Sequence, residues 1–213
     1  MPRRSAPLQA ALFDYGGVFA EEGFHEGMRA IAKAQRYDPD AFFEVARDAA
    51  YDTGYVIGHA TETQFWAALR RRYPLAGDDA TLASCLLERF RIRPAMLEAV
   101  RRLRSWDVCC ALLTDQTDWL DRLEARDHFF GEFDRIYNSY CLGKSKRDAS
   151  LFDDILFDVG LPAGAVVFID DNAGHVERAR GRGLRTIRFV DAQQCLDELG
   201  SLFGLPLREV TPG

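Results

Sequence analysis

The sequence predicts an α/β fold in which a parallel sheet carries helices on both faces. Short apolar runs alternate with helical patterns over most of the 213 residues, and this alternation is typical of parallel sheets. A second observation is a long segment after the first apolar run that reads as helices only. We expect strands at residues 9–14, 108–114, 134–139, 165–170 and 185–189. We expect helices at residues 94–106, 117–125, 147–159, 173–182 and 192–203.

The segment that interrupts the alternation predicts an inserted helical domain. Its helices are expected at residues 24–34, 39–53, 61–73 and 79–90. Thr61 and Gln64 have the spacing of a capping box, and an apolar stripe follows them. The predicted division is a core of residues 1–19 and 92–213 and a cap of residues 20–91. Because the insert directly follows the first strand, we expect it over the strand ends, where a lid belongs.

The composition argues against several classes of protein. A net charge of −6 and a pI near 5.3 disfavour a nucleic-acid binder, which is usually basic. No apolar run approaches the length of about 18 residues that a membrane span needs, so no membrane association is expected. Residues 1–7 read as a flexible lead rather than a signal peptide. The five cysteines include no Cys-x-x-Cys pair, which predicts a reduced, cytoplasmic protein.

Two of the predicted strands end in carboxylates. Asp14 ends the first apolar run, and Asp170 and Asp171 end the fourth. The carboxyl ends of parallel strands meet at one edge of the sheet, where such folds bind ligands. Gly16 and Gly17 allow a sharp turn and a close approach of the backbone to a ligand. Because Mg²⁺ prefers oxygen ligands, the sequence predicts a shared magnesium site at this edge.

The other strand ends supply groups that bind phosphate. Thr114 ends the second strand, and Asp115 follows it at the start of a predicted helix, whose first amides can hold an oxyanion. Lys144 and Lys146 follow the third strand, and an ammonium group neutralises phosphate charge. An aspartate such as Asp14 can attack phosphorus. Together these residue types suit phosphoryl transfer.

In order and spacing, these residues resemble the four motifs of the haloacid dehalogenase (HAD) superfamily. The motifs are Asp-x-Gly-Gly-Val, Leu-Leu-Thr-Asp, Leu-Gly-x-x-Lys and Phe-Ile-Asp-Asp-Asn, and they span essentially the whole chain. Residues 58–69 also look like part of the family's helical cap. In detail the chain resembles the branch that includes sugar-phosphate phosphatases similar to α-glucose-1-phosphate phosphatase. The resemblance implies a Rossmann-like core with an inserted α-helical cap.

The resemblance also implies the metal ligands. Asp14 would be both the nucleophile and a Mg²⁺ ligand, and Gly16 would offer its backbone carbonyl. Asp171 would be the second carboxylate ligand, with Asp170 beside it, bound directly or through water.

The phosphoryl group would be held by residues from three motifs. Thr114, the Asp115 amide and Gly17 would contact its oxygens. Lys146 matches the family lysine better than Lys144, because Lys146-Arg147-Asp148 stands at the place of the usual Lys-Pro-Asp.

One position departs from the family pattern. Most phosphatases of the superfamily carry a second aspartate two positions after the nucleophile, as general acid and base, and this chain has Gly16 there. Loss of a general acid costs roughly 10²–10⁴-fold in rate. Glu21, Glu22 and His25 near the cap entrance are the candidates to replace it.

The expected function is a Mg²⁺-dependent phosphatase of a small phosphorylated metabolite, with a sugar phosphate favoured, through an aspartyl-phosphate intermediate. One alternative is a 2-haloacid dehalogenase, which attacks carbon and needs no metal. The family's dehalogenases typically carry Tyr-Gly-Thr where this chain has Gly-Gly-Val. Another alternative is a non-catalytic protein that binds phosphoesters. The substrate and the oligomeric state stay open.

Three residues near the motifs have simpler interpretations. Asn172 after the acidic pair has the form of a helix N-cap. His175, in the first turn of that predicted helix, is expected to be exposed. Trp119 is expected to pack in the core or against the cap rather than to stack on substrate.

Overall fold

The computed structural model describes residues 7–207, and its centre is a five-stranded sheet in the order β3-β2-β1-β4-β5. All four strand pairings are parallel, which confirms the predicted α/β class. Each predicted strand is present, and no strand end differs from the prediction by more than one residue. The strands are β1 (Ala10–Phe13), β2 (Cys109–Thr114), β3 (Arg135–Asn138), β4 (Val166–Asp170) and β5 (Arg185–Arg188).

β1 lies at the middle of the sheet because every one of its side chains is apolar and buried. A strand covered on both faces needs such a continuous apolar run. Phe13 pairs with Leu112 of β2 and with Ile169 of β4. This register brings the residues that follow β1, β2 and β4 to the same edge of the sheet.

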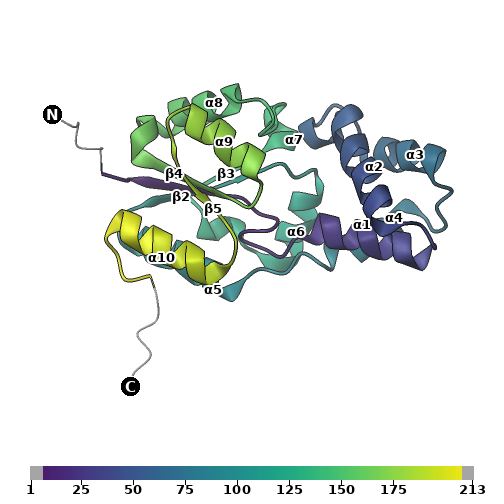
Figure 1. Ribbon diagram of the computed structural model, residues 1–213, viewed down its shortest axis with the longest axis horizontal. Coiled ribbons are helices and arrows are strands. Elements are labelled where there is room, and N and C mark those ends of the chain that lie inside the picture. The colour runs from purple at the N-terminus through teal and green to yellow at the C-terminus, as the bar shows by residue number, and fades with distance from the viewer. Residues whose placement is uncertain (1–6, 208–213) are drawn as a thin grey trace, which may run out of the picture.

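Helices cover both faces of the sheet (Figure 1). On one face, Ala11 and Phe13 pack in a core cluster with residues of α5 and α10, and on the other, Ala10 and Leu12 pack with residues of α8 and α9. The alternation follows from the two-residue period of a strand. The helices outside the inserted segment are α5 (Pro94–Ser105), α6 (Trp119–Asp127), α7 (Ser139–Leu142), α8 (Ser150–Val159), α9 (Ala173–Gly181) and α10 (Ala192–Phe203).

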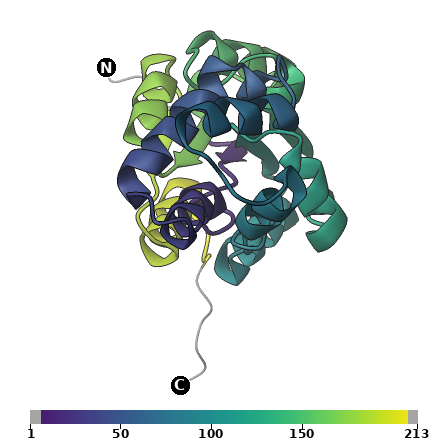
Figure 2. The same ribbon diagram turned by 90° about the vertical axis from the view of Figure 1, so that its right-hand side faces the viewer.

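The segment between β1 and α5 is helical, as predicted. Its α-helices are α1 (Gly23–Ala34), α2 (Pro39–Asp52), α3 (Glu62–Arg72) and α4 (Asp79–Leu87), with a short 3-10 turn at Tyr55–Ile57. They lie beyond the carboxyl ends of the strands (Figure 1), and they face the viewer in Figure 2. The capping box predicted from Thr61 and Gln64 is present at the start of α3. The domain boundaries at residues 19/20 and 91/92 remain a prediction.

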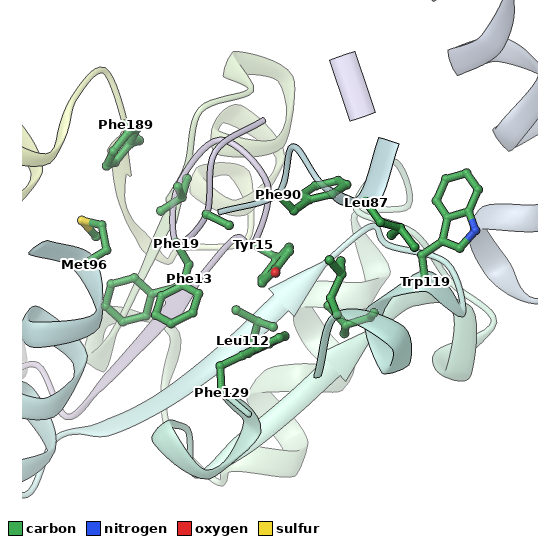
Figure 3. Close-up of a cluster of buried hydrophobic side chains, with 14 of the residues drawn as sticks. Phe13, Tyr15, Phe19, Leu87, Phe90, Met96, Leu112, Trp119, Phe129 and Phe189 are labelled. Atoms are coloured by element: carbon green, nitrogen blue, oxygen red, sulfur yellow. The ribbon is translucent and has the colours of Figure 1, made fainter. Parts of the chain in front are cut away.

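A cluster of aromatic rings joins the sheet to the start of this segment (Figure 3). The Tyr15 ring stacks on Phe129 with 5.0 Å between ring centroids, and it lies 5.6 Å from the Phe90 ring. Phe19 packs edge-on against Phe133 at 4.9 Å. These contacts fix the loop that follows Asp14, since the loop's own side chains are part of the core.

Two predicted helix starts are too early by two or three residues, and the prediction does not include one short helix. α8 begins at Ser150 rather than at residue 147, because the Asp148 carboxylate accepts a hydrogen bond from the Ser150 amide at 2.9 Å and closes a turn first. α6 begins at Trp119 rather than at residue 117, with Asp118 as its N-cap, so the prediction that Asp115 lies at the start of this helix is wrong. The unexpected helix is the single turn of α7, which ends at Gly143 with a φ of 68°.

The remaining predictions concern compartment and membrane. None of the helices within residues 7–207 combines the length and apolar character that a bilayer crossing requires. All five cysteines are free thiols. The expected N-terminal lead falls mostly on residues 1–6, outside the described residues.

The Tyr15 hydroxyl gives a test of the packing around the site. It is buried and has no hydrogen-bond partner among residues 7–207. Because an unpaired buried hydroxyl costs about 1–3 kcal/mol, we expect Tyr15→Phe to leave the free energy of unfolding unchanged or to raise it. Tyr15→Ala should lower it by about 3–5 kcal/mol, because it opens a cavity. Urea denaturation of both variants checks this, and a large loss in Tyr15→Phe would contradict the described packing.

Candidate active site

Asp14 leaves the end of β1 and points into the space between the sheet edge and the cap helices. Its Oδ1 accepts a hydrogen bond from the Tyr15 amide at 2.7 Å. Its Oδ2 forms an ion pair with Lys146 Nζ, also at 2.7 Å. Only 8% of the residue is exposed. The carboxylate is therefore held at both oxygens but lines an open cavity.

Lys146 is the buried cation of the site. Its Nζ lies 2.7 Å from Asp14 Oδ2 and 2.7 Å from Asp170 Oδ2. Burial lowers the pKa of Lys146, but the two carboxylates outweigh that effect and raise it above the usual range. Lys144 instead pairs with Asp154, away from the cluster. Of the two lysines that the sequence offered, the structure brings Lys146 to Asp14.

Asp170 ends β4 and is fully buried. Burial raises the pKa of its carboxyl, but Lys146 and His175 outweigh burial and hold the pKa well below its usual range. His175 Nδ1 lies 3.2 Å from Asp170 Oδ2. The expectation that His175 is exposed is wrong: Asn172 caps α9, as its sequence position suggested, and the first turn of that helix holds the His175 ring beside the Asp170 carboxylate, where it is buried.

Asp171 stands next to the glycine turn. A Cβ on Gly17 would clash with Asp171 Oδ2, and Gly17 has a φ of +82°. Both the left-handed backbone and the close carboxylate therefore require glycine here. Burial, and after it the Asp170 carboxylate, raises the pKa of Asp171.

The carboxylates of Asp14, Asp170 and Asp171 form one cluster, with ligand oxygens within 4.8 Å of one another. Burial and then the two neighbouring carboxylates raise the pKa of Asp14, against the effect of Lys146. A divalent cation relieves such crowding of negative charge. Mg²⁺ takes oxygen ligands and needs only one or two carboxylates, which this cluster of three can supply. The residues present therefore fit the predicted metal.

Thr114 and Asp115 form the wall contributed by β2. Thr114 is buried and lines the cavity beside Asp14. Asp115 Oδ1 accepts a hydrogen bond from the Lys146 amide at 2.8 Å, and its Oδ2 accepts one from Tyr51 Oη at 2.9 Å. Asp115 thus ties the lysine loop to the cap helix α2, a positioning contact that sequence reasoning missed.

The cavity has a volume of about 610 Å³ and lies between the sheet edge and the cap. Its cap side is lined by Phe24, Phe43 and Tyr51. Trp119 also borders it but is fully buried, as the packing interpretation predicted; its indole lies at the edge of the cluster in Figure 3. Arg147 stacks on Tyr51, with its Cζ 3.3 Å from the ring centroid.

The three candidates for the missing acid differ in placement. Glu22 lines the cavity, and burial raises its pKa to about 7. Its Oε1 accepts a hydrogen bond from the His25 amide at 3.1 Å and so caps α1. Glu21 pairs with Arg93 at 2.9 Å. His25 also borders the cavity, but its Nδ1 lies 3.0 Å from Glu26.

Comparison with known sequences gives limited information. No family model matches the chain. A drimenol cyclase from Aspergillus calidoustus is 29% identical over 158 residues, which are 71% of this chain and 30% of that protein. The chain therefore spans less than a third of the length of this curated relative.

Comparison with solved structures identifies the fold. A HAD family enzyme from Bacteroides thetaiotaomicron superposes with a TM-score of 0.70 at 20% identity, over 85% of this chain and 93% of that one. The same enzyme is also known in complex with magnesium and inorganic phosphate. L-2-haloacid dehalogenase from Xanthobacter autotrophicus gives 0.65 at 18% identity, over 91% and 83% of the two chains. The chain has the HAD fold, which confirms the resemblance at that level; the branch stays a prediction.

The carboxylate cluster predicts a stabilising effect of magnesium. Because Mg²⁺ would bind the folded chain, we expect MgCl₂ to raise Tm, with a contribution near 2.7 kcal/mol at about 100 times Kd. Differential scanning fluorimetry measures the shift against NaCl of equal ionic strength. Asp171→Asn should reduce the shift, while Asp154→Asn, outside the cluster, should keep it. An equal shift in all three chains would argue against this site.

Proposed function

We propose that this chain is a Mg²⁺-dependent HAD phosphatase that hydrolyses a small phosphorylated metabolite, with a sugar phosphate favoured, through an aspartyl-phosphate at Asp14. The observation that carries the proposal is the arrangement at the sheet edge. A buried lysine lies 2.7 Å from two aspartates, and a third aspartate completes an oxygen cluster beside an open cavity.

The roles of the residues follow from their positions. Asp14 attacks phosphorus, and the bond from phosphorus to the leaving oxygen breaks. The Lys146 ammonium, 2.7 Å from Asp14 Oδ2, favours the ionised form of Asp14 and offsets charge on the phosphoryl group. The Thr114 hydroxyl, with the Asp115 and Gly17 amides, holds the phosphoryl oxygens. Water then attacks phosphorus and releases phosphate from Asp14.

The metal would be held by the same edge of the sheet. Asp14, Asp171 and the Gly16 carbonyl would be its ligands, with Asp170 bound directly or through water. When bound, Mg²⁺ supplies positive charge that stabilises the phosphoryl oxygens in the transition state. Residues 20–91 would act as the cap that excludes water from the cavity and selects the substrate.

A 2-haloacid dehalogenase is the main rival. The chain shares its fold with the Xanthobacter dehalogenase as well as with the Bacteroides enzyme, so the fold alone does not favour the phosphatase over the dehalogenase. That enzyme class would use Asp14 on carbon, without a metal. The cluster of Asp170 and Asp171 beside Asp14 favours the phosphatase. These carboxylates could hold a metal ion, and the dehalogenase reaction needs none. The second rival is a phosphoester-binding protein without turnover, which the glycine at position 16 would suit.

The proposal also covers the family branch, the compartment and the class of partner. We place the chain near the sugar-phosphate phosphatases similar to α-glucose-1-phosphate phosphatase, on the resemblance of its motifs. Five free thiols favour a reducing compartment, so the cytoplasm is proposed. The partner is a small-molecule phosphoester rather than a nucleic acid or a membrane.

Phosphate release from a panel of sugar phosphates and other phosphoesters, with and without Mg²⁺, tests the function. We expect release that needs Mg²⁺, and a fall of at least about 10³-fold in Asp14→Asn, because the nucleophile is lost. Lys144→Met is the matched control, since Lys144 pairs outside the cluster, and it should keep the activity.

Two outcomes would contradict the proposal. Halide release from 2-haloacids without metal would identify the dehalogenase. Binding of phosphoesters and Mg²⁺ by calorimetry, with no phosphate released from any ester, would identify the non-catalytic binder.

A further inference from the structure

One carboxyl oxygen in the cavity has no hydrogen-bond or ion-pair partner among residues 7–207. Glu22 Oε1 accepts a hydrogen bond from the His25 amide, whereas Glu22 Oε2 takes part in no hydrogen bond or ion pair with the residues that the structure describes. The side chain lines the cavity that also holds Asp14. A half-buried carboxyl with one free oxygen can carry a proton toward a ligand in that cavity.

The free oxygen lies at a specific place beside the turn after the nucleophile. A Cβ built on Gly16, two residues after Asp14, would meet Glu22 Oε2 at 2.9 Å and Phe90 Cε1 at 3.3 Å. Gly16 is not among the glycines with positive φ, so its backbone would accept a side chain. The Glu22 carboxyl therefore fills the space that a side chain at position 16 would enter.

Resting on the phosphatase proposed above, we infer that Glu22 is the catalytic general acid and base, acting from the N-cap position of α1 in place of a side chain at Gly16.

Outside the cluster of Asp14, Asp170 and Asp171, the acidic groups in or near the cavity have partners that occupy them. Asp115 accepts hydrogen bonds at both oxygens, from Lys146 and from Tyr51. Glu21 pairs with Arg93 and does not line the cavity. Apart from the cluster of Asp14, Asp170 and Asp171, Glu22 is therefore the one carboxyl at the cavity, within residues 7–207, that has a free oxygen to give a proton to a leaving group.

In this role Glu22 gives up one proton in the first half of the reaction and takes one back in the second. As Asp14 attacks phosphorus, the bond from phosphorus to the leaving oxygen breaks and its electron pair stays on that oxygen. The Glu22 O–H gives its proton to the oxygen, which leaves as an alcohol. In the second half, the Glu22 carboxylate takes a proton from the attacking water, phosphate leaves Asp14, and Glu22 is protonated again.

The dependence of the rate on the leaving group distinguishes the general-acid role of Glu22 from its role as the N-cap of α1. An alkyl or sugar phosphate needs a proton on its leaving oxygen, whereas p-nitrophenyl phosphate releases a stable anion. For Glu22→Gln we expect kcat/KM to fall about 10²-fold or more on the sugar phosphate and less than about threefold on p-nitrophenyl phosphate. Glutamine keeps an oxygen that can cap α1, and Tm monitors the fold.

Two further variants sharpen the test. Glu21→Gln changes the neighbouring residue outside the cavity and should leave both rates unchanged. Glu22→Ala opens the space beside Gly16, so adding Gly16→Asp in that background should restore part of the rate on the sugar phosphate.

The outcomes separate the two proposals. Equal losses on both esters, or no loss on either, in a folded Glu22→Gln would overturn the role of Glu22 while leaving the phosphatase standing. No phosphate release by the native chain from either ester, or full activity in Asp14→Asn, would overturn both.

Discussion

The ion pairs of Lys146 with Asp14 and Asp170 are the interaction on which the candidate site depends. Three charged groups lie almost fully out of water at the end of a central strand. Removing one partner of a buried ion pair typically costs about 3–5 kcal/mol, because a charge is left unpaired. Asp115 adds a second constraint, since it binds the Lys146 backbone amide and so fixes where that side chain begins. The lysine thus sets the positions of both carboxylates.

The glycine pair after Asp14 shows how the rest of the site is packed around this cluster. The Asp171 carboxylate occupies the space that a side chain on Gly17 would need, and the Glu22 carboxyl occupies the space beside Gly16. At each of the two glycines, the absence of a side chain thus leaves room for a carboxyl group of another residue. The aromatic packing of Tyr15 against Phe129 and Phe90 holds the turn between them. Core and cap therefore meet at the turn itself, so the shape of the turn depends on both.

The fold and the strand-end residues were predictable because they follow local rules. Apolar runs give strands, parallel strands end at one edge, and Asp14, Thr114 and Asp170 stand at those ends. The burial of His175 was not predicted, although a histidine five residues after a strand-end aspartate, just behind an N-cap, is a usable signal. The choice of Glu22 over Glu21 could not come from the sequence. The two are adjacent, and only the path of α1 over the sheet decides which one enters the cavity.

The most direct test of the account is whether Asp14 carries phosphate during turnover. The chain is mixed with an active phosphoester and Mg²⁺, quenched in acid within milliseconds, digested and examined by mass spectrometry. We expect a phosphoryl group on the peptide that contains Asp14, and we expect it to disappear once the substrate has been consumed. Turnover with phosphate release while that peptide stays unmodified, or with the phosphoryl group on another residue, would contradict it.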